Sequence, residues 1–432
     1  MKKCTWGMNT KDRMPQDELY GPIKIPGYCW PIIDTVEFQR LRNISQLGAV
    51  TYVYPGANYS AFEHALGCCH LAQLFMDHIT EAQPELNVTE EMRMCASIGA
   101  LCHDLGRGPF GVVFERFAHE YDPDWSTKTM SEKLLRFIVK KYGIAIPQKV
   151  VDGACGVITG RATPICPEWV SQIVSGSPHD IDLNKFDYLS RDANRTITGT
   201  RFEYDRLIYH CRILDGKLSW RMSEVATIER VLFHRNDMHG RVYTHRVAQA
   251  VEFMIQDIFD CVSRKFNFDA VLDDPARFSE LDDRILYMVE HGEYDSEAKQ
   301  IAEDLKYRRL YKCVGELRVA PHNEAGRSYS QLPPTDIQDD IKSLLEDNDE
   351  DVEVRVSTYN FRYGLRPKSN PLKFIPFWRE GSDKPVFLKD EDLSYIMPAY
   401  YLETAMRVFV TDSTKVEKAK AAFEKWKKQR KL

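Results

Sequence analysis

Two histidines lie at positions where helical spacing turns them toward an interior. His64 shares an apolar stripe with Cys68 and Phe75 on one predicted helix, and His103 ends the apolar stripe of a second, with Asp104 directly after it. Imidazole and carboxylate groups are common ligands of divalent metals in proteins. A single inward histidine is more often a hydrogen-bonded core residue. These residues alone therefore leave both a core role and a metal site open.

A dense polar run follows at 180–192 and predicts a helix. Its polar members recur at spacings of three and four and are Asp180, Asn184, Asp187, Tyr188, Arg191 and Asp192. Apolar residues are interleaved with them, so the run is either a salt-bridged helix face or part of a site.

A third polar stripe consists of Arg235, His239 and Tyr243, which recur every four residues. Two cation-capable groups and a hydroxyl on one face would suit a polyphosphate. An exposed helix face produces the same pattern, and from these residues alone we favour the exposed face.

Capping signals and hydrophobic periodicity place the elements that must carry these residues. The predicted helices are 32–42 with Asp34 as N-cap, one from Ser60, one from Asn87 or Thr89 with Asn87 and Glu90 as a capping box, 134–141, one or two over 228–265, and 415–431. The predicted strands are 52–54, 352–356, 361–365 and 386–388, and 321–334 is predicted to be a linker or long loop.

Composition limits the class of protein. The 432 residues are 43% hydrophobic and 28% charged, which is typical of a soluble globular protein, and no apolar run reaches the roughly 20 residues of a membrane span. The net charge of -6 argues against a wholly basic nucleic-acid binder. The 11 scattered cysteines and the absence of a signal peptide predict a reducing compartment, either nucleus or cytoplasm, and no membrane partner.

Several blocks of sequence, in order along the chain, resemble the HD-domain dNTP triphosphohydrolase family. The blocks are Ile33-Asp34-Thr35, Phe38-Gln39-Arg40-Leu41-Arg42, Gln46-Leu47-Gly48, Tyr54-Pro55-Gly56-Ala57, Phe62-Glu63-His64-Ala65-Leu66-Gly67, Leu101-Cys102-His103-Asp104-Leu105-Gly106, Tyr307-Arg308 and Val314-Gly315-Glu316. Animal members carry a sterile-alpha-motif domain before the HD domain, and we do not expect that domain here.

The resemblance implies a mainly α fold with an HD-domain helical core and a smaller α+β C-terminal lobe. The expected regions are an N-terminal arm with allosteric-type contacts at 1–30, the helical core at 31–320, and the lobe with a basic terminal helix at 321–432. Family members cut a dNTP into deoxynucleoside and triphosphate, and they assemble as tetramers when GTP and dNTPs fill allosteric sites. Nucleotides and further copies of the chain, or a paralogue, are therefore the implied partners.

Carried over position by position, the resemblance also assigns site residues. The implied metal ligands are His64, His103, Asp104 and Asn184. The substrate contacts are Gln46, Leu47, Lys185, Tyr188, Arg235 and Tyr243, to which the polar stripe adds His239. The allosteric nucleotide contacts are Arg13, Asp17, Asp34, Gln39, Arg42, Val53, Arg206, Arg221, His245 and Arg246.

The catalytic positions depart from the family pattern. Asn184 stands where the family has an aspartate, so one anionic ligand is lost and an Fe, Mn, Zn or Mg ion would be held more weakly or not at all. Histidines of the family are replaced by Arg107, Val112 and Thr127, and a phosphate-binding arginine by Ala61. If Asp182 or Asp187 supplied the missing carboxylate, the metal would survive.

Three functions follow as hypotheses. The first is a pseudoenzyme that has little or no hydrolysis, keeps nucleotide binding and oligomerisation, and regulates an active paralogue. The second is an active metal-dependent phosphohydrolase with a rearranged site. The third is a nucleic-acid binder that uses the lysine-rich tail at 425–431, although a solvated last helical turn explains that tail more simply.

Overall fold

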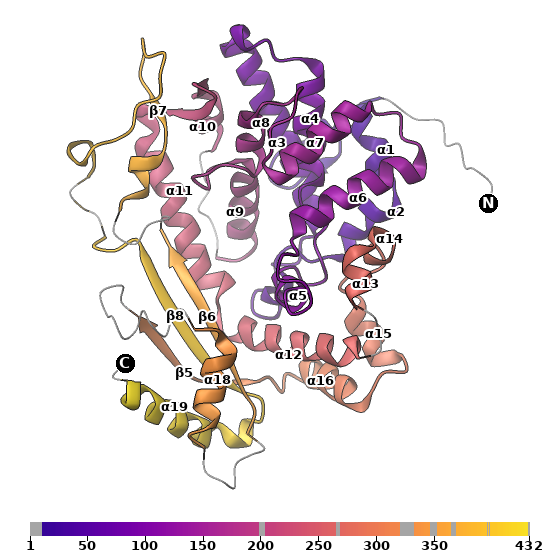
Figure 1. Cartoon of the computed structure of the whole chain (residues 1–432), viewed down its shortest axis with the longest axis vertical. Helices are drawn as coiled ribbons and strands as arrows, with labels where there is room; N and C mark the ends of the chain where they lie inside the picture. Colours follow the sequence, from indigo (N-terminus) through magenta and orange to yellow (C-terminus); the bar gives the residue numbers. More distant parts are fainter. Residues whose placement is uncertain are drawn as a thin grey trace.

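The computed structural model of the chain describes residues 11–197, 204–264, 268–319, 332–345, 352–363 and 369–430, apart from Tyr395 and Met397. The fold is mainly α, with a helical core and a smaller α+β lobe, as predicted (Figure 1). One hydrophobic cluster fills the helical core and a second fills the lobe.

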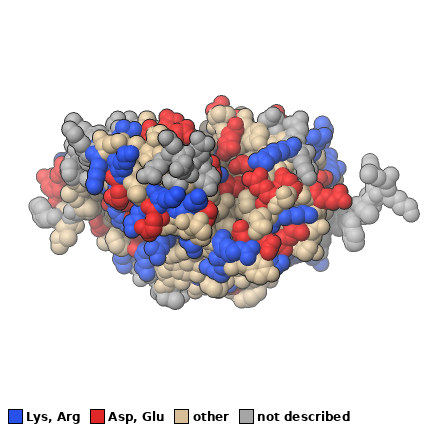
Figure 2. All heavy atoms as spheres, turned by 90° about the horizontal axis from the view of Figure 1, so that it is seen from below, with Lys and Arg blue, Asp and Glu red and all other residues tan. Residues whose placement is uncertain are grey.

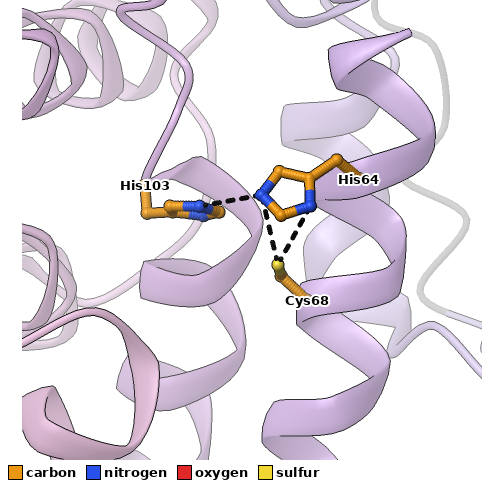
Figure 3. Close-up of side chains that lie close together, drawn as sticks. All are labelled: His64, Cys68 and His103. Atoms are coloured by element: carbon orange, nitrogen blue, oxygen red, sulfur yellow. Dashed lines mark hydrogen bonds between the residues drawn. The ribbon is translucent and has the colours of Figure 1, made fainter. Parts of the chain in front are cut away.

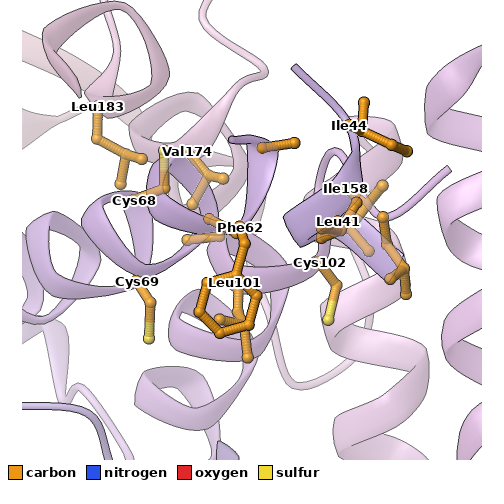
Figure 4. Packing of buried hydrophobic residues seen from close by; sticks show 14 of the residues in the cluster. Leu41, Ile44, Phe62, Cys68, Cys69, Leu101, Cys102, Ile158, Val174 and Leu183 are labelled. Atoms are coloured by element: carbon orange, nitrogen blue, oxygen red, sulfur yellow. The ribbon is translucent and has the colours of Figure 1, made fainter. Parts of the chain in front are cut away.

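The helix α3 (Ala61–Ala82) runs through the middle of the core and carries His64. Ser60 and Glu63 form a capping box at its start, which confirms the predicted first residue. The helix packs against α4 (Glu90–Cys102) and α9 (Leu183–Arg195). Figure 4 shows the apolar side chains that join these helices, including Phe62 and Cys68 from α3. This packing fixes the helices that carry the candidate metal ligands.

The remaining helices of the core surround this group. They are α1 (Trp30–Ile33), α2 (Val36–Gln39), α5 (Val112–Ala118), α6 (Thr127–Tyr142), α7 (Gln148–Thr159), α8 (Glu168–Val174), α10 (Tyr204–Tyr209), α11 (Val225–Met238), α12 (Arg246–Ser263), α13 (Phe268–Asp273), α14 (Pro275–Phe278), α15 (Ile285–His291) and α16 (Ser296–Lys306). A π-helix at His239–Tyr243 joins α11 to α12.

Two predicted N-caps, Asp34 and Asn87, are wrong. Asp34 ends α1 rather than capping a helix over 32–42, and Thr35 caps α2 by accepting from the backbone N–H of Phe38. Asn87 adopts a left-handed conformation with φ of 48°, so the capping box with Glu90 does not form. Thr89, the alternative start, caps α4. In both cases a neighbouring threonine has the extended backbone that an N-cap requires.

Other predicted boundaries differ. The extended segment predicted at 52–54 does not form, because Tyr52 ends a 3₁₀ helix over Gly48–Tyr52 and Val53 has a helical backbone conformation. The helix predicted over 134–141 begins earlier, at Thr127. At 386–388 a single bridge between Phe377 and Val386 replaces the predicted strand. Residues 361 and 362 of the strand predicted at 361–365 form the end of a longer strand, and residues 364–365 lie outside the described residues. Residues 321–331 of the predicted linker also lie outside the described residues.

The lobe is a three-stranded antiparallel sheet covered by two helices. Its strand order is β5 (Lys312–Val319), β8 (Leu402–Val410), β6 (Val354–Arg362), so β8 lies in the centre. The helices α18 (Pro334–Lys342) and α19 (Val416–Arg430) pack on it (Figure 1). Phe423 and Trp426 of α19 are fully buried in the hydrophobic cluster of the lobe.

Two smaller sheets belong to the rest of the molecule. In the arm, β1 (Gln16–Asp17) pairs with β2 (Gly21–Pro22). In the core, β3 (Cys211–Leu214) and β4 (Lys217–Arg221) form a hairpin, and β7 (Phe377–Trp378) lies parallel to β4. In the sequence, β7 lies between the lobe strands β6 and β8, but it pairs with a strand of the core. The predicted domain limits at residues 30 and 320 stay predictions.

Two further observations concern the class of protein. Within the described residues, none of the helices combines the length and the apolar character needed to cross a membrane. The ten cysteines in that part of the chain are all free, and nine of them are buried.

Candidate functional site

The side chains of His64 and His103 meet in the centre of the core. His64 is fully buried in the first turn of α3, and His103 is 2% exposed at the C-terminal end of α4. Their Nε2 atoms lie 3.2 Å apart. The structure therefore brings together the two histidines that helical spacing had turned inward.

The hydrogen bonds of the outer ring nitrogens set the tautomer of each histidine. His64 Nδ1 lies 2.7 Å from a carboxylate oxygen of Asp187, and His103 Nδ1 lies 2.8 Å from the carbonyl oxygen of Ala100. Because both oxygens accept, each Nδ1 carries a proton, and in the neutral form of each ring Nε2 presents a lone pair. Burial lowers the pKa of His103, which favours this neutral form.

Two oxygen ligands lie beside the facing nitrogens. Asn184, in the first turn of α9, places its Oδ1 3.1 Å from His64 Nε2, and Asp104 Oδ1 lies 3.8 Å from His103 Nε2. Lone pairs that converge without a donor repel one another. A divalent cation would relieve the repulsion, as would a proton on one ring or a reversed Asn184 amide. The donor types and their convergence fit a metal ion.

Neither of the two alternative carboxylates replaces the lost ligand. Asp187 contacts Nδ1 of His64, on the opposite side of the ring from Nε2. Asp182 caps α9 by accepting from the backbone N–H of Lys185 and pairs with its Nζ at 3.1 Å. The structure thus gives Asp187 the task of orienting His64, which the sequence pattern did not reveal.

Cys68 lies one helical turn after His64 and forms with His64 and His103 a buried group that could hold a metal ion (Figure 3). Its Sγ is 3.7 Å from Nδ1 and 3.6 Å from Nε2 of His64. Nearly equal distances place the sulfur beside the ring rather than along the Nε2 lone pair. Burial raises the pKa of the Cys68 thiol well above its usual value, so it stays protonated and is a poorer ligand than the two imidazoles.

Arg107 lies one turn after His103 and binds the candidate metal ligand Asp104. Its Nη1 is 3.3 Å from Asp104 Oδ2, and its Nη2 donates to the carbonyl oxygen of Gln46 at 2.8 Å. Burial alone would raise the pKa of Asp104, but nearby positive charge, that of Arg107 included, holds it well below the usual range. A fixed positive charge therefore already neutralises the anionic ligand.

The loop after Asp104 holds Arg107 in this position. Asp283 accepts from the backbone N–H groups of Ser45 and Phe110, at 2.8 and 2.7 Å, and so ties the loop to the segment before α3. Gly111 has φ of 57°, and a Cβ atom there would lie 2.6 Å from Arg107 Nη2. Glycine at this position gives the guanidinium its space.

Arg107 and Asp104 face a cavity of about 750 Å³ between the core and strand β6. Among the predicted substrate contacts, those lining it are Gln46, Leu47, Tyr188, Arg235, His239 and Tyr243. The exposed face that we favoured for Arg235, His239 and Tyr243 is wrong, because all three line the cavity. Lys185 does not line the cavity and pairs with Asp182 and Asp180 at its edge.

The replaced catalytic positions lie around the same region. Val112 lines the cavity, Ala61 is fully buried at the start of α3, and Thr127 begins α6. None of these three side chains can transfer a proton at neutral pH.

The predicted allosteric contacts fall into separate groups. Near the arm, Arg13 pairs with Asp34 at 3.1 Å, and Arg42 donates to Gln39 at 2.7 Å. Of the others, Asp17 is buried in the arm, Val53 follows the 3₁₀ helix, Arg206 pairs with Glu224, Arg221 pairs with Glu380, and His245 caps α12, which Arg246 begins.

Asp192 is a buried carboxyl at the cavity that sequence analysis placed on the polar run without a role. It accepts hydrogen bonds from the hydroxyl groups of Tyr59, at 2.5 Å, and Tyr243. Burial raises its pKa to about 6, against the opposing effect of these bonds. The cavity therefore holds a carboxyl that changes charge just below neutral pH.

Asp192→Asn should change the pH dependence of stability. The pKa of this carboxyl is about 3.9 in the unfolded chain and about 6 when folded. The wild type therefore has a stabilising contribution below about pH 4 that is lost as the pH rises through 6, up to about 3 kcal/mol in the free energy of unfolding. Urea unfolding at pH 4 and pH 7 would measure the difference between variant and wild type. The exposed carboxylate variant Asp205→Asn should show no such change, and equal pH profiles for wild type and Asp192→Asn would contradict the assignment.

Comparisons with known proteins agree with this geometry. Residues 202–358 match the family described as HD associated region. A protein of Dictyostelium discoideum named deoxynucleoside triphosphate triphosphohydrolase SAMHD1 homolog is 30% identical over 422 residues, which cover 96% of this chain and 80% of the relative. The enzymes named deoxynucleoside triphosphate triphosphohydrolase SAMHD1 from mouse and human are 29% and 28% identical, over 95% of this chain and 70% and 72% of their own lengths. The chain, with its paired histidines in an HD-type helical core, therefore belongs to the SAMHD1-like family of HD-domain deoxynucleoside triphosphate triphosphohydrolases.

Proposed function

We propose that this chain is a dNTP triphosphohydrolase homologue that has lost most or all hydrolysis, keeps nucleotide binding and oligomerisation, and regulates an active paralogue. The observation that carries the proposal is the bond between Arg107 and Asp104 at 3.3 Å. The guanidinium of Arg107, which cannot transfer a proton, thus stands where the resemblance to the family implies a histidine.

A divalent metal would be held by His64, His103, Asp104 and Asn184. When bound, such an ion polarises a phosphoryl oxygen and activates water. Two features of this chain weaken the site: Asn184 contributes a neutral amide, and Arg107 adds positive charge next to Asp104. Both changes lower the attraction for a cation, so we expect weak metal binding.

The charges around the cavity also disfavour a free triphosphate. The described lining residues include three arginines and four carboxyl groups. Each arginine already has an acidic partner: Arg107 has Asp104, Arg116 has Glu252 at 2.7 Å, and Arg235 has Asp180 at 2.8 Å. A triphosphate must therefore share each arginine with the carboxylate that already binds it, or bind together with a divalent cation.

The polar lining nevertheless suits a nucleotide. Gln46 Oε1, His239 Nδ1 and the Tyr359 hydroxyl are buried cavity-lining atoms without a hydrogen-bond partner. Unpaired buried polar groups are costly, and a polar ligand would supply the missing partners. Nucleotide binding without efficient hydrolysis is consistent with these groups and with the paired arginines.

The nucleic-acid alternative is less well supported. In the tail helix α19, Lys427 pairs with Glu424 at 2.6 Å and Arg430 pairs with Asp340. Figure 2 shows basic and acidic side chains intermixed over the face seen from below. A strand of nucleic acid would need a continuous basic surface.

Purified protein incubated with dGTP, GTP and Mg²⁺ or Mn²⁺ should release no more triphosphate than a heat-denatured control. Loss of a general acid or base typically costs roughly 10²–10⁴ in rate, and several such positions are changed here. Ion-exchange chromatography of the products would measure the release. Turnover that His64→Ala abolishes would instead establish an active phosphohydrolase with a rearranged site.

Restoring the implied catalytic residues should restore hydrolysis. We expect the variant Arg107→His, Thr127→His, Asn184→Asp to release triphosphate measurably, because it regains proton-transfer groups and an anionic ligand. The matched control is Arg107→Gln, Thr127→Gln, Asn184→Asp, which removes the same positive charge and gains the same carboxylate without a histidine. Equal rates in both variants, or no gain in either, would show that the loss of activity has another cause.

A further inference from the structure

A chain of buried charged groups connects the N-terminal arm to His64. Asp17 in β1 pairs with Arg191 in α9 at 2.7 Å, and Arg191 Nε pairs with Asp187 Oδ2 at 2.8 Å. The same Oδ2 accepts from His64 Nδ1 at 2.7 Å. The side chains of all four groups are at most 6% exposed, so solvent does not screen them.

The arm makes a second contact with this chain of groups. The Tyr20 hydroxyl donates to Asp187 Oδ1 at 2.9 Å, and Arg191 Nη2 donates to the same oxygen at 3.1 Å. Asp187 thus accepts two bonds on each oxygen, and all its lone pairs are used. Its orientation is set jointly by the arm, by α9 and by His64.

Asp17 also shapes the arm itself. Its Oδ1 accepts from the backbone N–H groups of Leu19 and Tyr20, at 2.8 and 3.2 Å, and so closes the turn between β1 and β2. Its Oδ2 is the partner of Arg191. One carboxylate therefore fixes the turn of the arm and docks it on α9. At 8% exposure it has little surface left for the nucleotide contact that the family resemblance implies.

The helix α3 leaves space for this arrangement at Gly67. A Cβ atom there would lie 2.0 Å from Asp187 Oδ1 and 2.4 Å from Arg191 Nη2. Any side chain at this position would displace the ion pair. Glycine one turn after His64 thus allows Asp187 and Arg191 to approach α3 closely.

This chain of charged groups sets the direction of the lone pair on His64 Nε2. As long as Asp187 accepts from Nδ1, the Nε2 lone pair points at His103 and Asn184. Without Asp17, Asp187 would be the one carboxylate of this chain of groups left to pair with the buried Arg191. Arg191 would then compete with His64 for the Oδ2 atom of Asp187. The ring of His64 would then lose its fixed tautomer and orientation.

We propose that Asp17 and Tyr20 are positioning residues for a metal ion, so that the arm at 16–22 must be docked on α9 for the site to bind metal well. This inference rests on the metal site of the proposed function, with His64 as one ligand. It assigns to the arm a control over metal affinity that acts within one chain.

The test is titration of the metal-free full chain with Co²⁺, followed by its visible absorption, which reports both affinity and ligand geometry. Changes in groups that orient metal ligands typically weaken affinity 10–100-fold. We expect Asp187→Asn to fall in that range, Asp17→Asn to weaken affinity up to about 10-fold, and both to alter the absorption bands. Tyr20→Phe keeps the ion pairs intact and should give a smaller loss in the same direction.

Glu18→Gln is the matched control, because Glu18 lies in the same arm and pairs with Arg195 of the same helix, outside the chain of groups. It should bind Co²⁺ like the wild type. The double variant Asp17→Asn, Asp187→Asn should bind no more weakly than Asp187→Asn alone, since Asp17 acts through Asp187. A general loss of folding would instead weaken binding further and would appear in the circular dichroism spectrum.

The outcomes separate this inference from the proposed function. Wild-type affinity in both Asp17→Asn and Tyr20→Phe, or additive losses in the double variant, would overturn the role of the arm and leave the metal site standing. A wild-type chain that binds no Co²⁺ would overturn the metal site and the role of the arm together.

Discussion

The saturated carboxylate of Asp187 is the constraint on which the centre of this molecule depends. It holds the proton of His64 on Nδ1 and pairs with the buried Arg191. Burial would raise its pKa, but Arg191 and the bond from His64 lower it to about 2, so its charge persists at any physiological pH. Removing one partner of such a buried pair typically costs about 3–5 kcal/mol, because the other charge remains unpaired. The buried ion pair with Arg191 thus helps to keep Asp187 in the position that orients His64.

On the other side of the two histidines, a guanidinium group lies beside the anionic candidate ligand. Asp104 is the single anionic group among the four implied ligands, and Arg107 binds one of its oxygens. A metal ion would have to share Asp104 with a permanent cation. The rigid scaffold that orients the histidines is therefore present, while the charge and the proton-transfer groups of the expected reaction are missing.

Helical periodicity and capping predicted much of this arrangement. The inward stripes of α3 and α4 brought His64 and His103 together, and Ser60 marked the start of α3 correctly. The bonds of Asp187 to Tyr20 and of Arg191 to Asp17 could not be predicted, because they join residues 167 and 174 positions apart. The exposure of Arg235 and Tyr243 was misjudged because strand β6, which lies more than 100 positions later in the chain, lines the other side of the cavity that they face.

We propose that His64, His103, Asp104 and Asn184 hold a divalent metal, and that Arg107 weakens its binding. A crystal structure of the chain grown with Mn²⁺ and a dNTP, with anomalous scattering recorded at the manganese edge, tests it most directly. The predicted result is a partly occupied peak between these four side chains, with Arg107 still bound to Asp104. A fully occupied ion with Arg107 turned away from Asp104 would contradict it.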